Sequence, residues 1–245
     1  MVNILYFDCF AGVCAKRLLG ALLDLGLDKQ VADNALLQLN PGFTYELCAN
    51  KTQINAIDCT AASVKTDHPA LQKDQALALL SRASFSPPAV SRAVSVIEKL
   101  NAVPSDVFLE IVACCALIGA LFSDKCMSAP LRDGMGVKDG VPLPLPEVLA
   151  LLKTYRVPYR ILESAEPFCT PDGVALIAAH THEYGPIPEM EIAKIGYGGA
   201  DGRLLRVITG HTTPDTLSDF FETSMELDRM EFQNVSYISK EVLAR

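Results

Sequence analysis

The residues best suited to chemistry lie in one short segment near the N-terminus. Asp8 and Cys9 end an apolar run, and Gly12 follows them in a predicted turn. Lys16 and Arg17 come in the first turn of a helical pattern. In α/β folds ligands collect where a strand ends, and the free N–H groups at a helix start attract anions. Two bases there oppose the helix dipole. The segment therefore indicates one of two things. It forms a site for a phosphate or a carboxylate, or Lys16 and Arg17 are solvated bases beside the buried thiols of Cys9 and Cys14.

A second polar segment is Thr170-Pro171-Asp172-Gly173. Thr170 can cap a helix, Pro171 suits its first turn, and Asp172 complements its positive end. Helix capping alone explains these residue types. A threonine and an aspartate at a helix start can also hold a ligand hydroxyl or a metal-bound water, so both interpretations remain open.

The histidine and cysteine pairs give no recognisable metal site. His180 and His182 share a face only on a strand, and at a helix end they diverge by about 160°. Cys114 and Cys115 lie in an apolar helical pattern, where cysteine acts as a small buried side chain. The glycines of residues 196–202 lead into another strand instead of a helix, which indicates a hairpin and not a dinucleotide fingerprint. The metal ligands, if any, stay unknown from the sequence.

The elements that must position these residues alternate between short strands and helices. Apolar runs and period-2 stretches predict strands at residues 3–8, 43–48, 57–64, 159–162, 191–197 and 204–208. Helical spacing predicts helices at residues 13–25, 33 or 34–40, 74–81, 91–100, 105–122, 148–154, 170–181 and 234–245. Prolines and glycines predict an irregular loop over residues 130–147, crossing near the binding cleft.

This pattern predicts a mixed α/β (α+β) fold with one main domain. Two strand pairs have the spacing of hairpins, which argues against a purely parallel sheet. Half of the 245 residues are hydrophobic and a fifth are charged, as in a globular protein.

Composition also limits the partners and the compartment. A formal net charge of -8 and the lack of tryptophan argue against nucleic acid and anionic membrane as partners. The longest apolar run, residues 111–122, is too short to span a bilayer. No secretory signal is apparent and the eight cysteines form no CxxC pair, so we expect reduced thiols and a cytoplasmic location.

Taken together, the segments resemble the LarC family of nickel-insertion proteins. No single motif carries this resemblance; the order and spacing of several do. The matching stretches are Ile4–Gly12, Leu18–Gly26, Thr170–Leu176, Tyr184–Pro188, Ile195–Gly198 and Leu205–Val207.

The resemblance implies a specific activity. Members of this family use CTP with a divalent metal to place nickel into a pyridinium bisthiocarboxylate mononucleotide, the cofactor of lactate racemase. It implies nickel and CTP as cofactors and a nucleotide-like pyridinium molecule as partner. The residues implied as catalytic are Asp8, Cys9 and Asp172, and those implied as cofactor-binding are Gly12, Lys16, Arg17 and Thr170.

The chain also departs from the family pattern. Residues 11–17 stand where the family has hydroxyls and a carboxylate, and Phe108–Glu110 and Cys115 stand where it has HFHE and an aspartate. Only His68 remains of a histidine-rich segment. Residues 1–221 resemble the family's N-terminal domain, and residues 222–245 resemble only the start of its C-terminal domain.

These departures leave alternatives open. The chain is expected to be the N-terminal component of a nickel-insertion protein, completed by a separate C-terminal domain or by a homo-oligomer. The main alternative is a degenerate, non-catalytic paralogue that binds a ligand or a partner. A third is an enzyme of unrelated chemistry on the same fold, since a fold does not determine a function.

Overall fold

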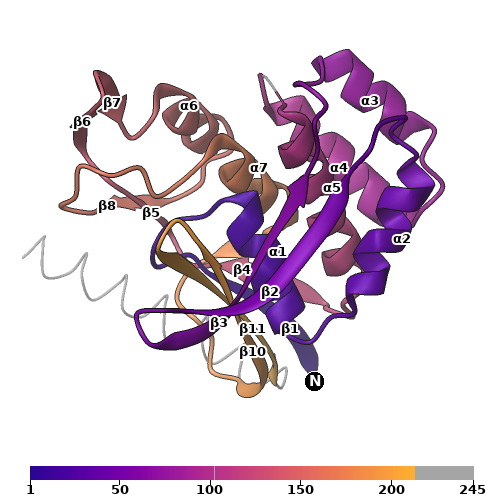
Figure 1. Ribbon diagram of the computed structural model, residues 1–245. Coiled ribbons are helices and arrows are strands. Elements are labelled where there is room, and N and C mark those ends of the chain that lie inside the picture. Colours follow the sequence, from indigo (N-terminus) through magenta and orange to yellow (C-terminus); the bar gives the residue numbers. More distant parts are fainter. Residues whose placement is uncertain (102, 213–245) are drawn as a thin grey trace, which may run out of the picture.

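The computed structural model describes residues 1–101 and 103–212, and a seven-stranded mixed sheet lies at its centre (Figure 1). The strand order is β2-β3-β10-β11-β1-β4-β9. The neighbours β2–β3, β10–β11 and β11–β1 are antiparallel, whereas β3–β10, β1–β4 and β4–β9 are parallel. The strands are β1 (Val2–Asp8), β2 (Glu46–Ile54), β3 (Ile57–Lys65), β4 (Lys125–Ser128), β9 (Glu183–Tyr184), β10 (Glu191–Ala200) and β11 (Arg203–Thr212). The predicted mixed α/β fold with two hairpin-type pairs is confirmed.

Strand β1 lies inside the sheet and is buried on both faces. Leu5 and Phe7 belong to the main core, whereas Ile4 and Tyr6 belong to a smaller cluster on the opposite face. Side chains alternate between the faces of a strand, so a continuous apolar run is what such a position requires. Asp8 ends the strand and shares a face with Tyr6.

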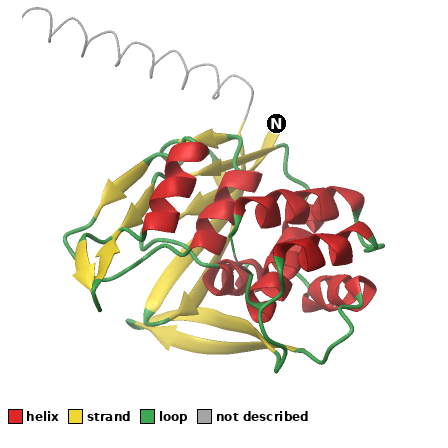
Figure 2. Ribbon diagram, turned by 90° about the horizontal axis from the view of Figure 1, so that it is seen from above, coloured by secondary structure: helices red, strands yellow, loops and turns green. Residues whose placement is uncertain are grey.

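Seven helices are present in the described residues, and most gather on one side of the sheet (Figure 2). α1 lies directly on β3, β10 and β11, and α5 packs behind it. The predicted apolar helix is confirmed, with Cys114 and Cys115 fully buried in it. The helices are α1 (Ala15–Asp24), α2 (Lys29–Leu39), α3 (Lys73–Ser81), α4 (Pro87–Lys99), α5 (Ser105–Ala120), α6 (Pro146–Thr154) and α7 (Pro171–His180).

Two glycines of β10 allow α1 to lie close to the sheet. A Cβ at Gly198 would lie 1.8 Å from the carbonyl oxygen of Arg17, and one at Gly196 would lie 2.2 Å from that of Ala21. No side chain fits in such a space. The structure therefore has the predicted glycine hairpin, and these two glycines also let the backbone of α1 approach it closely.

The prediction of an irregular loop over residues 130–147 is wrong. This segment forms β5 (Leu131–Asp133), β6 (Gly136–Lys138) and β7 (Val141–Leu143). β6 and β7 make a hairpin whose turn residues Asp139 and Gly140 have positive φ, and β5 pairs in parallel with β8 (Tyr159–Ile161). Strands of three residues in two-stranded sheets tolerate the prolines and glycines that would disrupt a central strand.

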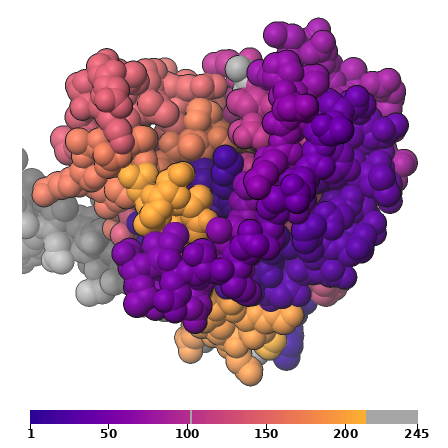
Figure 3. All heavy atoms as spheres, viewed as in Figure 1, coloured from indigo at the N-terminus to yellow at the C-terminus, as the bar shows by residue number. Residues whose placement is uncertain are grey.

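These short strands and α6 form a lobe on the opposite side of the molecule from α2 and α3 (Figure 1). In the space-filling view this lobe lies at the upper left, indigo and purple segments from the N-terminal part of the chain cover much of the right side, and orange segments form most of the bottom (Figure 3).

Other differences from prediction concern element bounds. α4 begins at Pro87 instead of Ser91, because proline is well suited to the first turn of a helix. The short strands β4 and β9 were not predicted. The predicted helix at 234–245 and the predicted domain boundary at 221–222 lie outside the described residues. Among the described residues, no helix is both long and apolar enough to cross a membrane.

Candidate functional site

The structure brings together the two polar segments at residues 8–17 and 170–173. The Thr170 N–H donates to the carbonyl of Val13 over 3.0 Å, and a Cβ at Gly173 would lie 2.4 Å from the same oxygen. Asp172 Oδ2 accepts a hydrogen bond of 2.8 Å from the N–H of Ala15, at the start of α1. The positive end of α1 therefore faces a carboxylate of this chain.

The buried side chain of Arg17 connects these two segments by hydrogen bonds. Its side chain is 3% exposed. The guanidinium donates to the carbonyl of Ala11 over 2.6 Å, to that of Phe168 over 2.5 Å, and to Cys14 Sγ over 3.1 Å. The alternative of two solvated bases is therefore wrong for Arg17. Lys16 is half-exposed, with its Nζ 3.9 Å from Asp106.

Gly12 and Cys9 also belong to the junction, as we call the contact between residues 8–17 and residues 168–173. Gly12 has φ +72°, and a Cβ there would lie 2.2 Å from the carbonyl oxygen of Phe168. Cys9 is fully buried, with Sγ 3.9 Å from the Ser128 hydroxyl. Burial raises the pKa of the Cys9 thiol to about 12, so the sulfur is protonated at neutral pH. The contacts of both residues stabilise the loop itself.

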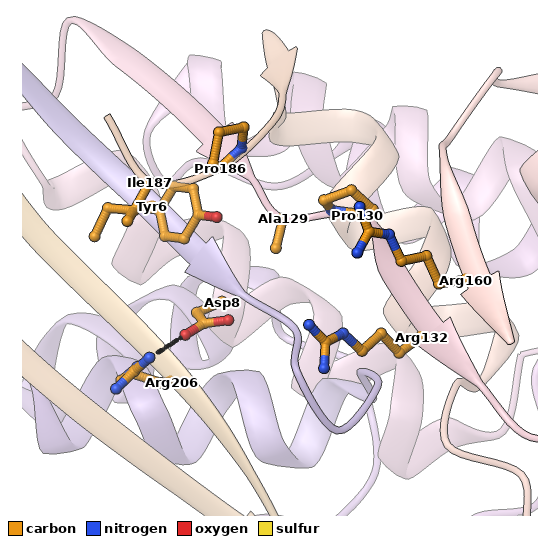
Figure 4. Close-up of a pocket in the computed structure, with 9 residues that line it drawn as sticks. All are labelled: Tyr6, Asp8, Ala129, Pro130, Arg132, Arg160, Pro186, Ile187 and Arg206. Atoms are coloured by element: carbon orange, nitrogen blue, oxygen red, sulfur yellow. Dashed lines mark hydrogen bonds and ion pairs between the residues drawn. The ribbon is translucent and has the colours of Figure 1, made fainter. Parts of the chain in front are cut away.

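Asp8 points away from this junction into a cavity of about 400 Å³ (Figure 4). The cavity lies at the carboxyl ends of β1 and β4. It opens on the sheet face that carries Tyr6 and Ile208, opposite the main core. Its lining residues are Tyr6, Asp8, Ala129, Pro130, Arg132, Arg160, Pro186, Ile187 and Arg206.

The charge of this cavity is strongly positive for a chain of net charge -8. Three guanidinium groups face one carboxylate. Arg206 Nε donates to Asp8 Oδ2 over 2.9 Å, and its Nη2 contacts the same oxygen. Arg132 and Arg160 are direct neighbours across the β5–β8 pair. Arg132 and Arg160 therefore give the cavity an excess of positive charge over its one carboxylate.

Tyr6 contributes a neutral hydroxyl to the cavity wall. It donates to the carbonyl of Gly185 over 3.0 Å. Burial, with a smaller effect from the negative charge of Asp8, raises the pKa of Tyr6 to about 12. The hydroxyl therefore keeps its proton at neutral pH and fixes the loop that carries Pro186 and Ile187.

The histidines of the C-terminal end of α7 have local partners. His180 Nδ1 lies 2.9 Å from the carbonyl oxygen of Leu176, and burial lowers the pKa of His180 to about 4. His182 Nδ1 accepts from the N–H of Cys126 over 3.0 Å. In the part of the chain that the structure describes, no three His, Cys, Asp or Glu side chains are placed to hold one metal ion.

Sequence reasoning missed the arginines of the cavity. Arg132 falls in the segment predicted to be an irregular loop, and nothing in the sequence brings it near Arg160 or Arg206. One signal was present: Arg160 stands between Tyr159 and Ile161, an alternation typical of a short strand with one polar face.

The fold and the cavity together define a class: a mixed α/β protein with a cationic cavity, of the size of a small ligand, at the carboxyl ends of two of its strands. The family follows from comparison with known proteins. The chain belongs to the nickel insertion protein family, whose model matches residues 5–108 and 102–245.

Curated relatives support this assignment. Three proteins named pyridinium-3,5-bisthiocarboxylic acid mononucleotide nickel insertion protein align with most of the chain. That of Acetivibrio thermocellus is 32% identical over 250 residues, covering 86% of this chain and 61% of the relative. That of Geobacillus kaustophilus is 28% identical over 259 residues, covering 89% and 62%. That of Desulfitobacterium hafniense is 28% identical over 217 residues, covering 79% and 53%.

The chain thus spans less than two thirds of the length of these relatives. No solved structure gives a significant match to it.

Proposed function

We propose that this chain takes part in nickel insertion into a pyridinium bisthiocarboxylate mononucleotide, and that the cavity at the ends of β1 and β4 binds the mononucleotide. The observation that carries the proposal is the excess of guanidinium groups over carboxylates in a cavity of about 400 Å³. That volume suits a small ligand. A molecule with one phosphate and two thiocarboxylates is polyanionic, and guanidinium groups bind such anions through charge-assisted hydrogen bonds.

Nickel is the inorganic substrate of this reaction. Thiocarboxylate sulfur is a soft donor that binds nickel well, so the organic substrate supplies metal ligands of its own. The chain's residues then bind and orient that substrate. Asp8 is the proposed catalytic residue, because its carboxylate faces the cavity and can bind an arriving divalent cation or accept a proton.

The remaining residues implied by the family resemblance act in this proposal as positioning residues. Cys9, Gly12, Arg17, Thr170 and Asp172 fix the junction that follows β1, and so fix Asp8. Lys16, at the edge of this junction, adds positive charge outside the cavity.

Other parts of the proposal concern the complete system. CTP with a divalent metal and the link to lactate racemase come from the family resemblance, whereas a cytoplasmic location is proposed from the cysteine content of the chain. From the same resemblance we propose a C-terminal domain or a second copy of the chain as a partner in the activity.

The test is nickel transfer into the mononucleotide by the full chain with CTP and Mg²⁺. It is run with and without the C-terminal segment of the Acetivibrio thermocellus relative. We expect transfer that Asp8→Asn abolishes and that Asp201→Asn, in the exposed β10–β11 turn, leaves unchanged. If no nickel transfer occurs either with or without that C-terminal segment, the proposal that the chain takes part in an enzymatic reaction is wrong.

A second candidate function is ligand binding without catalysis. It is favoured by the absence of a three-ligand metal cluster among the described residues and by the departures at residues 11–17. Calorimetry with nickel alone tests the non-catalytic form. Micromolar binding, about 8 kcal/mol, needs several ligands and would count against the non-catalytic form.

A further inference from the structure

Two arginines of the cavity stand directly opposite each other on neighbouring strands. In the parallel register of β5 and β8, Arg132 pairs with Arg160, between the pairs Leu131–Tyr159 and Asp133–Ile161. Directly paired residues project from the same face of a sheet. Figure 4 shows both guanidinium groups directed into the cavity, across from Tyr6 and Asp8. Like charges in this arrangement repel each other.

The neighbouring acids do not compensate this repulsion. Asp133 follows Arg132 and faces the other side of β5, where its Oδ1 accepts N–H groups of Gly134, Phe168 and Cys169. Asp8 is held by Arg206. Within residues 1–101 and 103–212, neither Arg132 nor Arg160 forms an ion pair with a carboxylate. In the described part of the chain, the two guanidinium groups are therefore open to a ligand.

We propose that Arg132 and Arg160 form a clamp for a phosphate monoester dianion, the phosphate end of the mononucleotide. This inference rests on the proposed function. The opposite wall, with Tyr6 and the Asp8–Arg206 pair, then faces the pyridinium ring and its acidic substituents. The clamp determines which end of the substrate lies beside Asp8.

Charge and geometry favour phosphate over a carboxylate for this position. One arginine satisfies one carboxylate, as the Asp8–Arg206 pair demonstrates in the same cavity. Two guanidinium groups offer two forks of N–H donors and two positive charges. A phosphate monoester carries close to two negative charges at neutral pH and three terminal oxygens, so it can accept from both forks.

The experiment is calorimetry at pH 7.5 with three probes. They are nicotinic acid mononucleotide, its riboside without phosphate, and inorganic phosphate. The variants are Arg132→Gln and Arg160→Gln, with Arg156→Gln as the matched control, because Arg156 is exposed and outside the cavity. We expect each cavity variant to weaken mononucleotide binding about 10- to 100-fold, as loss of one charge-assisted bond does. Riboside binding should not change.

Melting temperatures of the free proteins provide a second readout. Relief of the repulsion between Arg132 and Arg160 should leave the melting temperature of either variant unchanged or slightly higher. A folding defect would lower it and would weaken the binding of all three probes equally. Equal loss of mononucleotide and riboside binding, unchanged mononucleotide binding, or no binding of mononucleotide and phosphate to the wild type would each overturn the clamp.

Failure of the clamp and failure of the proposed function give different results. If nickel transfer is absent but phosphate-dependent binding needs Arg132 and Arg160, the proposed function fails and the clamp stands. If transfer proceeds while Arg132→Gln and Arg160→Gln bind the mononucleotide normally, the clamp fails and the function stands.

Discussion

Arg17 shows how burial changes the role of a charged residue. A base in the first turn of a helix normally opposes the helix dipole. Arg17 is nevertheless almost fully buried, and its guanidinium donates hydrogen bonds to two carbonyl oxygens and one thiol sulfur. Buried carbonyls left without a donor cost free energy, and these two, of Ala11 and Phe168, belong to segments far apart in the sequence. Arg17 therefore stabilises the junction behind Asp8.

We expect Arg17→Met to lower the free energy of unfolding by about 3 kcal/mol, because it removes several buried hydrogen bonds at once. Lys16→Met, next to it on the half-exposed side, should change the free energy of unfolding by less than about 1 kcal/mol. Urea denaturation of the two variants provides the comparison. If Arg17→Met left the free energy of unfolding nearly unchanged, the guanidinium would not hold the two segments together.

Glu110 makes stability depend on pH. It is 1% exposed in α5, and its Oε1 accepts from the N–H of Val64 over 3.1 Å. Burial raises the pKa of Glu110 from 4.5 to about 8. The folded chain therefore keeps a proton that the unfolded chain releases above pH 4.5. The contribution of protonated Glu110 to the free energy of unfolding is therefore complete below about pH 4.5. It is lost as the pH rises from about 4.5 to about 8.

We expect Glu110→Gln to remove this part of the pH dependence, since glutamine keeps the acceptor for Val64 but does not ionise. One pKa unit corresponds to about 1.4 kcal/mol. Between pH 5 and pH 8, the free energy of unfolding of the wild type should therefore fall by on the order of 4 kcal/mol more than that of the variant. Denaturation curves at several pH values measure this difference. Glu98→Gln, on the exposed side of α4, is the control and should follow the wild type.

At the scale of elements, the contact between α1 and β10 depends on glycine. We expect Gly198→Ala to destabilise the protein by at least about 3 kcal/mol, because the added Cβ would lie 1.8 Å from the carbonyl oxygen of Arg17 and would push α1 off the sheet. A Cβ at Gly185 meets nothing within 4 Å, so Gly185→Ala should be close to neutral. Equal melting temperatures for the two variants would contradict the close approach.

Much of the fold could be predicted because each local pattern agreed with its tertiary environment. β1 is a continuous apolar run and is buried on both faces; α1 has helical spacing and covers the sheet, and the long apolar helix α5 is buried behind it. The lobe could not be predicted in this way. Its strands have three residues each, too few for a period to be recognised, and the segments that connect them contain several prolines and glycines.

The site was predictable only where it is continuous in sequence. Asp8 stands at the end of a recognisable strand, so its place at a ligand edge could be inferred. Arg132, Arg160 and Arg206 come from β5, β8 and β11, and only the tertiary fold brings them to Asp8. No local pattern shows which charged residues on separate strands will face the same cavity.

At the scale of the whole molecule, nearly all thiols are protected. The eight cysteines are free, and seven are buried, whereas Cys48 on β2 is partly exposed. We expect a thiol reagent to modify one cysteine quickly in the folded protein, and the other seven only as fast as the chain opens. All eight should react at once in concentrated guanidinium chloride. Cys48→Ser should remove the fast phase, and two or more fast thiols would contradict the burial of the rest.

The place of the β10–β11 hairpin in the sheet has a consequence for protein synthesis. The hairpin lies between β3 and β1, and residue 2 pairs with residue 212. On the ribosome, β2–β3 and β1–β4 can pair early, but the sheet cannot close until β11 emerges, roughly 10 to 40 s after β1 at ordinary rates of elongation. Because β11 also supplies Arg206, the cavity is completed in that same last step. A nascent chain therefore cannot bind its anionic ligand with the full cavity before the central sheet has closed.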